Sequence, residues 1–194
     1  MHADTHEADE RALVARAQDD PAAFAALYRN YLPRVHDFAY RRTGSVEASE
    51  DICAATFEAA LSSLHRFRWG RGGFAPWLFR IASRQLVTYY RRESRVRSDR
   101  GQRAAAQLTV GVAPAADHDV TGHGADIESL RAALGRLNSR YQEAISLRYL
   151  ADLDIGEAAA AMGLARPAFS VVLTRATAAL RKELEQSNGV NHAE

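Results

Sequence analysis

The sequence predicts an all-α protein made of two small helical domains joined by a flexible linker. Apolar residues recur at spacings of three and four along most of the chain, which is the period of an amphipathic helix, and runs of β-branched residues are scarce. Residues 101–126 differ, because Ala, Gly, Asp and His dominate there and no aromatic residue occurs. The 194 residues suffice for one domain or two small ones. We therefore expect helical domains at 1–100 and 127–187, a linker at 101–126 and a disordered tail at 188–194.

The first three helices are marked by their ends. Residues 10–19 form a short helical segment. Asp20-Pro21 then supplies an N-cap residue and a proline suited to the first helical position, and Thr43-Gly44 ends the helix that starts there. The third helix begins at Ser45 or Ser49, and the pattern leaves both alternatives open.

A loop and a long basic helix follow. Residues 68–73 contain three Gly in six positions, which is typical of a loop, and Pro76 begins a helix expected over 76–97. One stripe of this helix is apolar and comprises Leu78, Ile81, Ala82, Leu86 and Tyr89. A second stripe, at i, i+4, i+8 and i+11, comprises Arg80, Arg84, Thr88 and Arg91. Like charges on one stripe repel one another, so an anionic partner along this stripe would explain them.

The second domain is expected to contain four helices. The first two occupy 127–137 and 141–150. The third occupies 155–162, and Pro167 lies in the first turn of the fourth. Two short helices joined at Gly163-Leu164-Ala165 match a helix-turn-helix, whose second helix would read the major groove of duplex DNA. A generic helical hairpin fits the same pattern equally well.

The charge of the chain is distributed unevenly. The whole chain has 25 Lys+Arg and 24 Asp+Glu, for a net charge of +1. Residues 65–103 hold 11 Arg against 2 acids, a net charge of +9. Residues 1–64 have 6 bases and 11 acids, and residues 104–130 have 4 acids and no base. A basic block between two acidic ones predicts an anionic partner for that block, despite the near-zero total.

Aromatic residues are concentrated in the same block. Seven of the chain's 16 aromatics, including both Trp, lie there: Phe67, Trp69, Phe74, Trp77, Phe79, Tyr89 and Tyr90. Arginine binds phosphate and aromatic faces stack on unstacked bases, so this interleaving favours binding of single-stranded nucleic acid. The alternative is that the aromatics form a helical core and the arginines a solvated face.

Other function classes have little support in the sequence. A single Cys argues against a disulfide framework and a zinc site of several thiolates, and there is no apolar run long enough to span a membrane. The first ten residues lack the apolar stretch of a secretory signal, so a cytoplasmic location is expected. Asp117, His118, Asp119 and His123 lie in the predicted linker, so we predict neither a metal site nor a cofactor. No nucleotide-binding loop or HExxH motif occurs, and we expect no enzyme.

Two groups of motifs, in this order, carry a family resemblance. The first comprises Phe24 to Tyr31, Glu50-Asp51-Ile52, Thr56-Phe57, Phe67, Gly73-Phe74, Pro76 to Ala82 and Arg91-Arg92. The second comprises Leu134, Leu137, Tyr141-Gln142-Glu143-Ala144, Leu147-Arg148-Tyr149-Leu150, the helix-turn-helix, Arg175-Ala176 and Ala179-Leu180-Arg181. They resemble regions 2 and 4 of bacterial RNA polymerase sigma factors, and most closely the extracytoplasmic-function (ECF) group of the sigma-70 family.

The resemblance implies a subunit that binds core RNA polymerase, recognises the minus-ten and minus-thirty-five promoter elements, and is commonly controlled by an anti-sigma factor. It implies that the β′ coiled coil of the polymerase binds Glu50, Asp51, Ile52, Thr56 and Phe57. Recognition and melting of the minus-ten element would involve Arg66, Phe67, Trp69, Arg71, Phe74, Trp77, Arg80, Arg84, Thr88, Arg91 and Arg92. The helix-turn-helix domain would touch the β flap and contact the minus-thirty-five element through Arg166, Ser170, Val171, Thr174 and Arg175.

The sequence departs from the family pattern in both predicted DNA readers. Ser83-Arg84 stand where the family usually has Arg-Asn, and Thr88 stands where an Asp is common. Because Asn bonds a base edge bidentately whereas Arg favours phosphate or guanine, the preferred minus-ten sequence stays open. Ser170-Val171-Val172 stand where polar and basic residues are usual, so we expect the first domain to dominate promoter affinity. The alternative function is a stand-alone helix-turn-helix regulator of duplex operators, which the aromatic and basic block disfavours.

Overall fold

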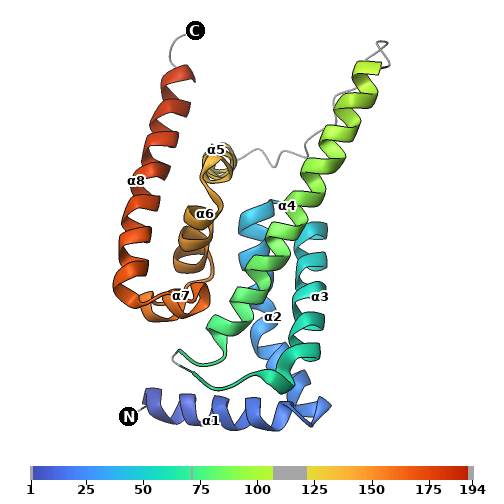
Figure 1. Ribbon diagram of the computed structural model, residues 1–194, viewed down its shortest axis with the longest axis vertical. Coiled ribbons are helices and arrows are strands. Elements are labelled where there is room, and N and C mark those ends of the chain that lie inside the picture. Colours follow the sequence, from blue (N-terminus) through green and yellow to red (C-terminus); the bar gives the residue numbers. More distant parts are fainter. Residues whose placement is uncertain (1, 71, 107–121, 192–194) are drawn as a thin grey trace.

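The computed structural model describes residues 2–70, 72–106 and 122–191, and within these ranges the chain is helical and has no β-strand. In chain order the elements are α1 (His2–Ala17), α2 (Pro21–Thr43), α3 (Val46–Ser63), η1 (Leu64–Arg66), α4 (Ala75–Ala106), α5 (Gly122–Arg136), α6 (Ser139–Ile145), η2 (Ser146–Leu150), α7 (Ile155–Met162) and α8 (Arg166–Asn191). The predicted all-α fold is confirmed. Figure 1 shows two groups of helices, α1 to α4 and α5 to α8, lying side by side.

Local sequence signals fix the ends of α2 and α3. The Asp20 side chain accepts a hydrogen bond from a backbone N–H in the first turn of α2 at 2.8 Å. Gly44 follows the last turn of α2 in the left-handed conformation, with a φ of 70°. Ser45 rather than Ser49 caps α3, because the Ser45 hydroxyl accepts the backbone N–H of Ala48 at 3.1 Å.

The first group is a bundle of α2, α3 and α4, with α1 packed across one end (Figure 1). Phe38 and Phe79 lie at its centre, fully buried, and their rings meet edge to face at a centroid distance of 5.4 Å. The face of α4 that enters this core is the predicted apolar stripe, including Leu78, Ala82 and Leu86. The arginine stripe of α4 therefore points away from the bundle.

The second group contains the predicted helix-turn-helix. Asp154 begins α7 with a capping box, in which its side chain accepts the Glu157 N–H and the Glu157 carboxylate accepts the Asp154 N–H, both at 2.8 Å. Gly163, with a φ of 68°, ends α7 and directs the chain into α8. Phe169 in the first turns of α8 is fully buried in the same apolar cluster as Ala158 and Ala159 of α7.

The two groups of helices pack against each other. Helix α7 lies against α4 (Figure 1). The η2 turn lies against α2. One cluster of buried apolar side chains continues from α2, α3 and α4 into α6, η2, α7 and the start of α8. The molecule is therefore closed, with the long basic helix facing the helix-turn-helix domain.

Helical structure extends into both ends of the predicted linker. Helix α4 continues to Ala106 and α5 begins at Gly122, while residues 107–121 lie outside the described part of the chain. Helix α8 likewise continues to Asn191 and enters the tail that was predicted to be disordered at 188–194. The physical reason is that an established helix extends at little cost per residue, and three alanines end α4.

Candidate nucleic-acid and polymerase interfaces

The aromatic residues of the basic block form a cluster at the start of α4. Phe67 packs edge-on against Trp69, Phe74 and Trp77 at centroid distances of 6.2, 5.7 and 5.1 Å. Phe67 and Phe74 are 6% and 1% exposed, and Phe74 also meets Tyr31 of α2 at 5.3 Å. Trp69 and Trp77 are half-buried. The two phenylalanines therefore belong to the core, and of these four rings only the tryptophans present area that a base can contact.

The loop before α4 is shaped by two glycines with positive φ. Gly72 and Gly73 have φ values of 87° and 75°. A Cβ on Gly73 would lie 3.4 Å from the Trp69 ring, and a Cβ on Gly72 would lie 3.3 Å from the Glu157 side chain. The loop thus contacts both the aromatic cluster and the start of α7. Arg71, a predicted minus-ten residue in this loop, lies outside the described residues.

The arginine stripe of α4 is divided between the domain contact and solvent. Arg80 is half-buried, and its guanidinium donates from Nε to the carbonyl of Ala161 at 2.6 Å and from Nη2 to the carbonyl of Ala160 at 2.5 Å. These carbonyls belong to the last turn of α7, whose partial negative charge attracts a cation. The other charged or polar minus-ten side chains that the structure describes are exposed: Arg66, Arg84, Thr88, Arg91 and Arg92.

A groove of about 480 Å³ lies between the middle of α4 and α6. Arg84 of α4 and Glu143 of α6 line it from opposite sides. Burial raises the pKa of the Glu143 carboxyl, and the nearby Arg80 and Arg84 offset part of that rise. Ser83 and Ser146, one from each domain, also line the groove, and within the described residues their buried hydroxyls have no hydrogen-bond partner. The contact between the domains is thus incompletely satisfied along this groove.

Helix α8 presents most of the predicted minus-thirty-five residues to solvent. Arg166, Val171, Thr174 and Arg175 are exposed, whereas Ser170 is half-buried. The hydroxyls of Ser170 and Thr174 donate to the carbonyls of Arg166 and Ser170 at 3.1 and 3.0 Å. The helix therefore offers two guanidinium groups, and its nearby hydroxyls are already bonded to its own backbone.

The predicted polymerase surface lies on α3, and its five residues divide by burial. Glu50 and Asp51 are exposed. Ile52 and Phe57 are 3% and 5% exposed, and Thr56 is fully buried, with its hydroxyl donating to the Ile52 carbonyl at 2.6 Å. The two carboxylates are therefore available for direct contact, while the other three side chains hold α3 in the core.

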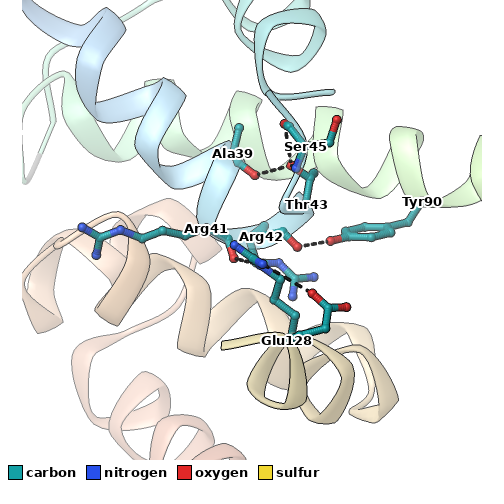
Figure 2. A network of polar contacts seen from close by, with 8 residues as sticks. Ala39, Arg41, Arg42, Thr43, Ser45, Tyr90 and Glu128 are labelled. Atoms are coloured by element: carbon teal, nitrogen blue, oxygen red, sulfur yellow. Dashed lines mark hydrogen bonds and ion pairs between the residues drawn. The ribbon is translucent and has the colours of Figure 1, made fainter. Parts of the chain in front are cut away.

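Sequence reasoning assigned no role to the residues that join the domains at the end of α2. Arg131 of α5 donates from Nε to the Arg41 carbonyl at 3.0 Å. Arg42, only 6% exposed, donates to Oε1 of Gln142 in α6 at 2.9 Å. The Arg42 carbonyl accepts the Tyr90 hydroxyl at 2.6 Å, as Figure 2 shows. No local periodicity marks the two interdomain bonds, because their partners are 90 and 100 positions apart in the chain.

Chemistry of other kinds is not assembled in the described residues. Among them, no group of three or more His, Cys, Asp or Glu side chains could hold a metal ion. The side chains of Asp117, His118, Asp119 and His123 lie outside the described part. Burial raises the pKa of the Cys53 thiol to about 11, so this thiol is protonated at neutral pH. None of the described helices combines the length and the apolar character that crossing a membrane requires.

Two family models match the chain. Sigma-70 region 2 matches residues 27–96, and Sigma-70, region 4 matches residues 127–180. The first match begins in α2 and ends within α4, and the second begins in α5 and ends within α8. Each match therefore lies within one of the two groups of helices, and the second match includes the turn between α7 and α8.

Individual relatives agree with these matches. The chain is 32% identical to the ECF RNA polymerase sigma factor BldN of Streptomyces coelicolor, over 94% of this chain and 68% of the relative. CnrH, solved in complex with the cytosolic domain of CnrY, has the same fold, with a TM-score of 0.65 and 23% identity over 91% of this chain and 97% of CnrH. The sigma factor RpoE of Bartonella quintana, solved with the anti-sigma factor NepR, gives a TM-score of 0.57 and 23% identity over 84% and 96% of the two chains. The chain therefore belongs to the ECF group of the sigma-70 family of RNA polymerase sigma factors.

Proposed function

We propose that this chain binds core RNA polymerase and directs promoter-specific initiation of transcription, recognising the minus-ten element with its first domain and the minus-thirty-five element with its second. The observation that carries the proposal is the construction of α4. This helix combines a buried apolar stripe, an arginine stripe and, at its start, an aromatic cluster with two accessible tryptophans. Arginines neutralise phosphates and aromatic faces stack on bases of a separated strand, whereas a reader of intact duplex needs no such platform.

Within the minus-ten surface the residues have different tasks. Trp69 and Trp77 contact unstacked bases, while Phe67 and Phe74 form the rigid floor that holds both indoles. A rigid floor matters because unstacking a base costs a few kcal/mol, which a mobile side chain would not recover. The exposed arginines of α4 contact the phosphates of the same strand.

The second domain adds a weaker contact. Helix α8 enters the major groove of the minus-thirty-five element with Arg166 and Arg175 as its cations. Two weak sites joined in one chain gain avidity when the spacing of the DNA elements matches their positions on the polymerase. The helix-turn-helix therefore contributes mainly by being held next to the stronger reader.

Binding of core polymerase involves both domains. The exposed carboxylates of Glu50 and Asp51 on α3 bind the β′ coiled coil, and the second domain touches the β flap. Replacing both residues by Arg reverses the charge of this surface, so we expect loss of co-elution with core polymerase in gel filtration. Asp19→Arg, at an exposed acid between α1 and α2, is the matched control and should co-elute normally. Equal co-elution of both variants would remove α3 from the polymerase interface.

Control by an anti-sigma factor in the cytoplasm is part of the proposal. The structurally similar RpoE was solved with the anti-sigma factor NepR, and CnrH was solved with the cytosolic domain of CnrY. In the closed molecule both DNA readers belong to one compact body, so a single protein partner can cover both. Such a partner would keep the chain from polymerase until a signal releases it.

Run-off transcription tests the central claim. Purified chain and core polymerase are mixed with a library of promoter fragments, and the transcripts are sequenced. The proposal expects discrete start sites that are absent with core polymerase alone. Absence of specific initiation would overturn it, and tight binding to intact duplex without any effect of polymerase would instead indicate a stand-alone regulator.

A further inference from the structure

Three arginines line the groove between α4 and α6. Arg84 and Arg91 come from α4 and Arg42 comes from α2, and the groove has a volume of about 480 Å³. This volume lies within the range of small-molecule sites in proteins. Among the described residues that line the groove, Glu143 is the only acid. The lining therefore has an excess of positive charge, which favours an anionic ligand.

Arg42 is a buried cation that is not paired with an acid in the described part of the chain. It is 6% exposed, and its guanidinium donates to Oε1 of Gln142 at 2.9 Å and stacks over the Tyr90 ring at 5.1 Å. Burial lowers the pKa of this guanidinium, because a low-dielectric surrounding disfavours the charged form. A guanidinium has five N–H donors, so Gln142 satisfies only part of the donor capacity of Arg42. An anion in the groove would offset the cost of burying this charge.

Two serines of the groove have buried hydroxyls. Ser83 of α4 and Ser146 of η2 are 8% and 3% exposed, and neither hydroxyl has a hydrogen-bond partner within the described residues. Both residues line the groove, and a serine hydroxyl rotates about a single side-chain bond, so each can turn toward a ligand oxygen there. Such a hydrogen bond would remove the cost of an unpaired buried hydroxyl. These serines distinguish the groove from a cluster of surface arginines.

The spacing of the arginines favours an extended anion. Arg84 and Arg91 are seven residues apart on α4, which is about 10 Å along the helix axis. A single phosphate would require both long side chains to bend toward each other, at a cost in rotamer entropy. A chain of two or three phosphates can instead contact each guanidinium separately, and guanidinium groups bind phosphate oxygens through paired hydrogen bonds.

We infer that the groove between α4 and α6 binds a small polyphosphate, held by Arg42, Arg84 and Arg91. The phosphate oxygens accept hydrogen bonds from the three guanidiniums and from the hydroxyls of Ser83 and Ser146. The three cations outweigh the single carboxyl of Glu143 on the opposite side of the groove. Both an inorganic chain and a nucleoside triphosphate contain the required group. The site does not depend on the proposed function, because binding requires neither polymerase nor promoter DNA.

Isothermal titration calorimetry on the full-length chain tests the site. Inorganic tripolyphosphate and ATP are titrated separately at about 0.15 M salt without magnesium, so that weak surface attraction is screened. We expect saturable one-to-one binding with a Kd below about 1 mM. Tighter binding of ATP would assign the site to a nucleoside triphosphate, and equal or tighter binding of tripolyphosphate would assign it to the phosphate chain alone. The absence of saturable binding of both probes would overturn the inference.

The buried serines provide the most specific variants. Ser83→Ala and Ser146→Ala each remove a hydroxyl without a partner, so the free chain should be as stable as before or more stable. Each variant should nevertheless weaken tripolyphosphate binding by about threefold to tenfold, because a hydrogen bond to the ligand is lost. Ser62→Ala, at an exposed serine of α3, is the matched control and should bind normally. Thermal unfolding followed by circular dichroism measures the stability of each variant.

The arginines provide a second comparison. Arg84→Ala should weaken tripolyphosphate binding by about tenfold, whereas Arg29→Ala, at an exposed arginine of α2 that does not line the groove, should leave it unchanged. Equal weakening by the two arginine variants would indicate attraction to the overall charge and would overturn the inference. Weakening by Arg84→Ala without any effect of Ser83→Ala and Ser146→Ala would place the anion on the exposed arginines alone, with the same consequence.

A nucleic-acid strand is the other polyanion to be tested. A single-stranded oligonucleotide of about 12 nucleotides is titrated into the same variants. If Ser146→Ala weakens binding of the oligonucleotide but not of tripolyphosphate, the groove is part of a nucleic-acid surface and the inference is wrong. Run-off transcription tests the proposed function separately, because these titrations contain neither polymerase nor promoter DNA.

Discussion

Helices α4 and α8 are the two predicted DNA-reading helices of this chain. Helix α4 has the higher positive charge, whereas the predicted reading face of α8 is more accessible to solvent. Helix α4 belongs to the segment with a net charge of +9, yet its Arg80 is bonded to α7. Helix α8 leaves Arg166 and Arg175 exposed but has only those two cations near the predicted reading face. The reader predicted to be stronger is therefore the one that the closed fold partly covers, and the reader left open is the one predicted to be weaker. In the free chain, neither helix alone combines high charge with full access.

The difference depends on what each helix contributes to the core. Helix α4 has a wide apolar face that joins both domains, so its polar stripe lies next to the seam between them. Helix α8 packs mainly within its own domain, through a face that runs from Phe169 to Leu180, and leaves Arg166, Val171 and Arg175 exposed. The variants with the largest expected effect on stability test whether the two domains unfold as one cooperative unit.

Phe79→Ala and Phe169→Ala remove a fully buried ring from α4 and from α8 within the same apolar cluster. Each should lower the free energy of unfolding by about 3–5 kcal/mol. Because both tryptophans lie in the first domain, tryptophan fluorescence follows that domain while circular dichroism follows all helices. If the contact between the domains couples their unfolding, Phe169→Ala shifts the urea midpoint of the fluorescence transition as well.

The control for this pair is Val171→Ala, at a side chain that is 51% exposed on α8, which should change stability by less than about 0.5 kcal/mol. A fluorescence midpoint unaffected by Phe169→Ala would show that the domains unfold independently.

Promoter affinity provides the next test of the contrast between the helices. Arg80→Ala combined with Arg84→Ala removes two of the cations aligned on α4, whereas Arg175→Ala removes one from α8. On the polymerase, where both readers engage DNA, we expect the α4 pair to reduce initiation by roughly tenfold or more and Arg175→Ala by less, because charge density sets the phosphate contribution. Open-complex formation on one promoter measures both. A larger loss from Arg175→Ala would reverse the ranking of the two readers.

Local signals in the sequence predicted the helices and several of their ends correctly. The N-cap at Asp20, the αL glycines at 44 and 163 and the apolar stripe of α4 all follow from interactions within a few residues. The arrangement of the two domains could not be predicted in this way. The Arg131 and Arg42 contacts connect residues 90 and 100 positions apart, and neither periodicity nor composition contains that information.

The candidate site was predictable only in part for a related reason. The clustering of charge and aromatic residues selected the segment of the proposed minus-ten surface, but it did not distinguish an accessible ring from one that faces the core. Phe67 and Trp69 lie two positions apart in the same loop, yet one is buried and the other half-buried. In a loop without a regular period, the direction of a side chain depends on tertiary packing. The same limit applied to Phe57 on α3, whose ring packs against Tyr28 of α2 at a centroid distance of 4.6 Å.

A smaller effect on stability is expected at the capping box of α7, the first helix of the helix-turn-helix, which packs against α4. Asp154→Ala removes the side chain that accepts the Glu157 N–H and should destabilise α7 by about 1 kcal/mol. Asp154→Asn retains an oxygen acceptor and should cost much less. Thermal unfolding followed by circular dichroism compares the two variants. Equal losses would indicate that the charge of Asp154 near the α7 N-terminus, rather than the capping hydrogen bond, supports the helix.

The smallest expected effect concerns Glu143, the carboxyl that faces the α4 arginines across the groove. Burial raises its pKa above the ordinary value of 4.5, so the folded chain holds this proton more tightly than the unfolded chain does. Folding stability contributed by this group therefore falls as pH rises through the raised pKa, and the carboxylate is a net cost at neutral pH. Glu143→Gln should raise the melting temperature by roughly 1–2 °C at pH 7, with the gain disappearing as the pH approaches 4. Glu50→Gln, which removes an exposed carboxyl in the same way, is the matched control. A lower melting temperature for Glu143→Gln at pH 7 would mean that attraction to Arg80 and Arg84 outweighs the cost of burial, and the seam would then be held by charge on both sides of the groove.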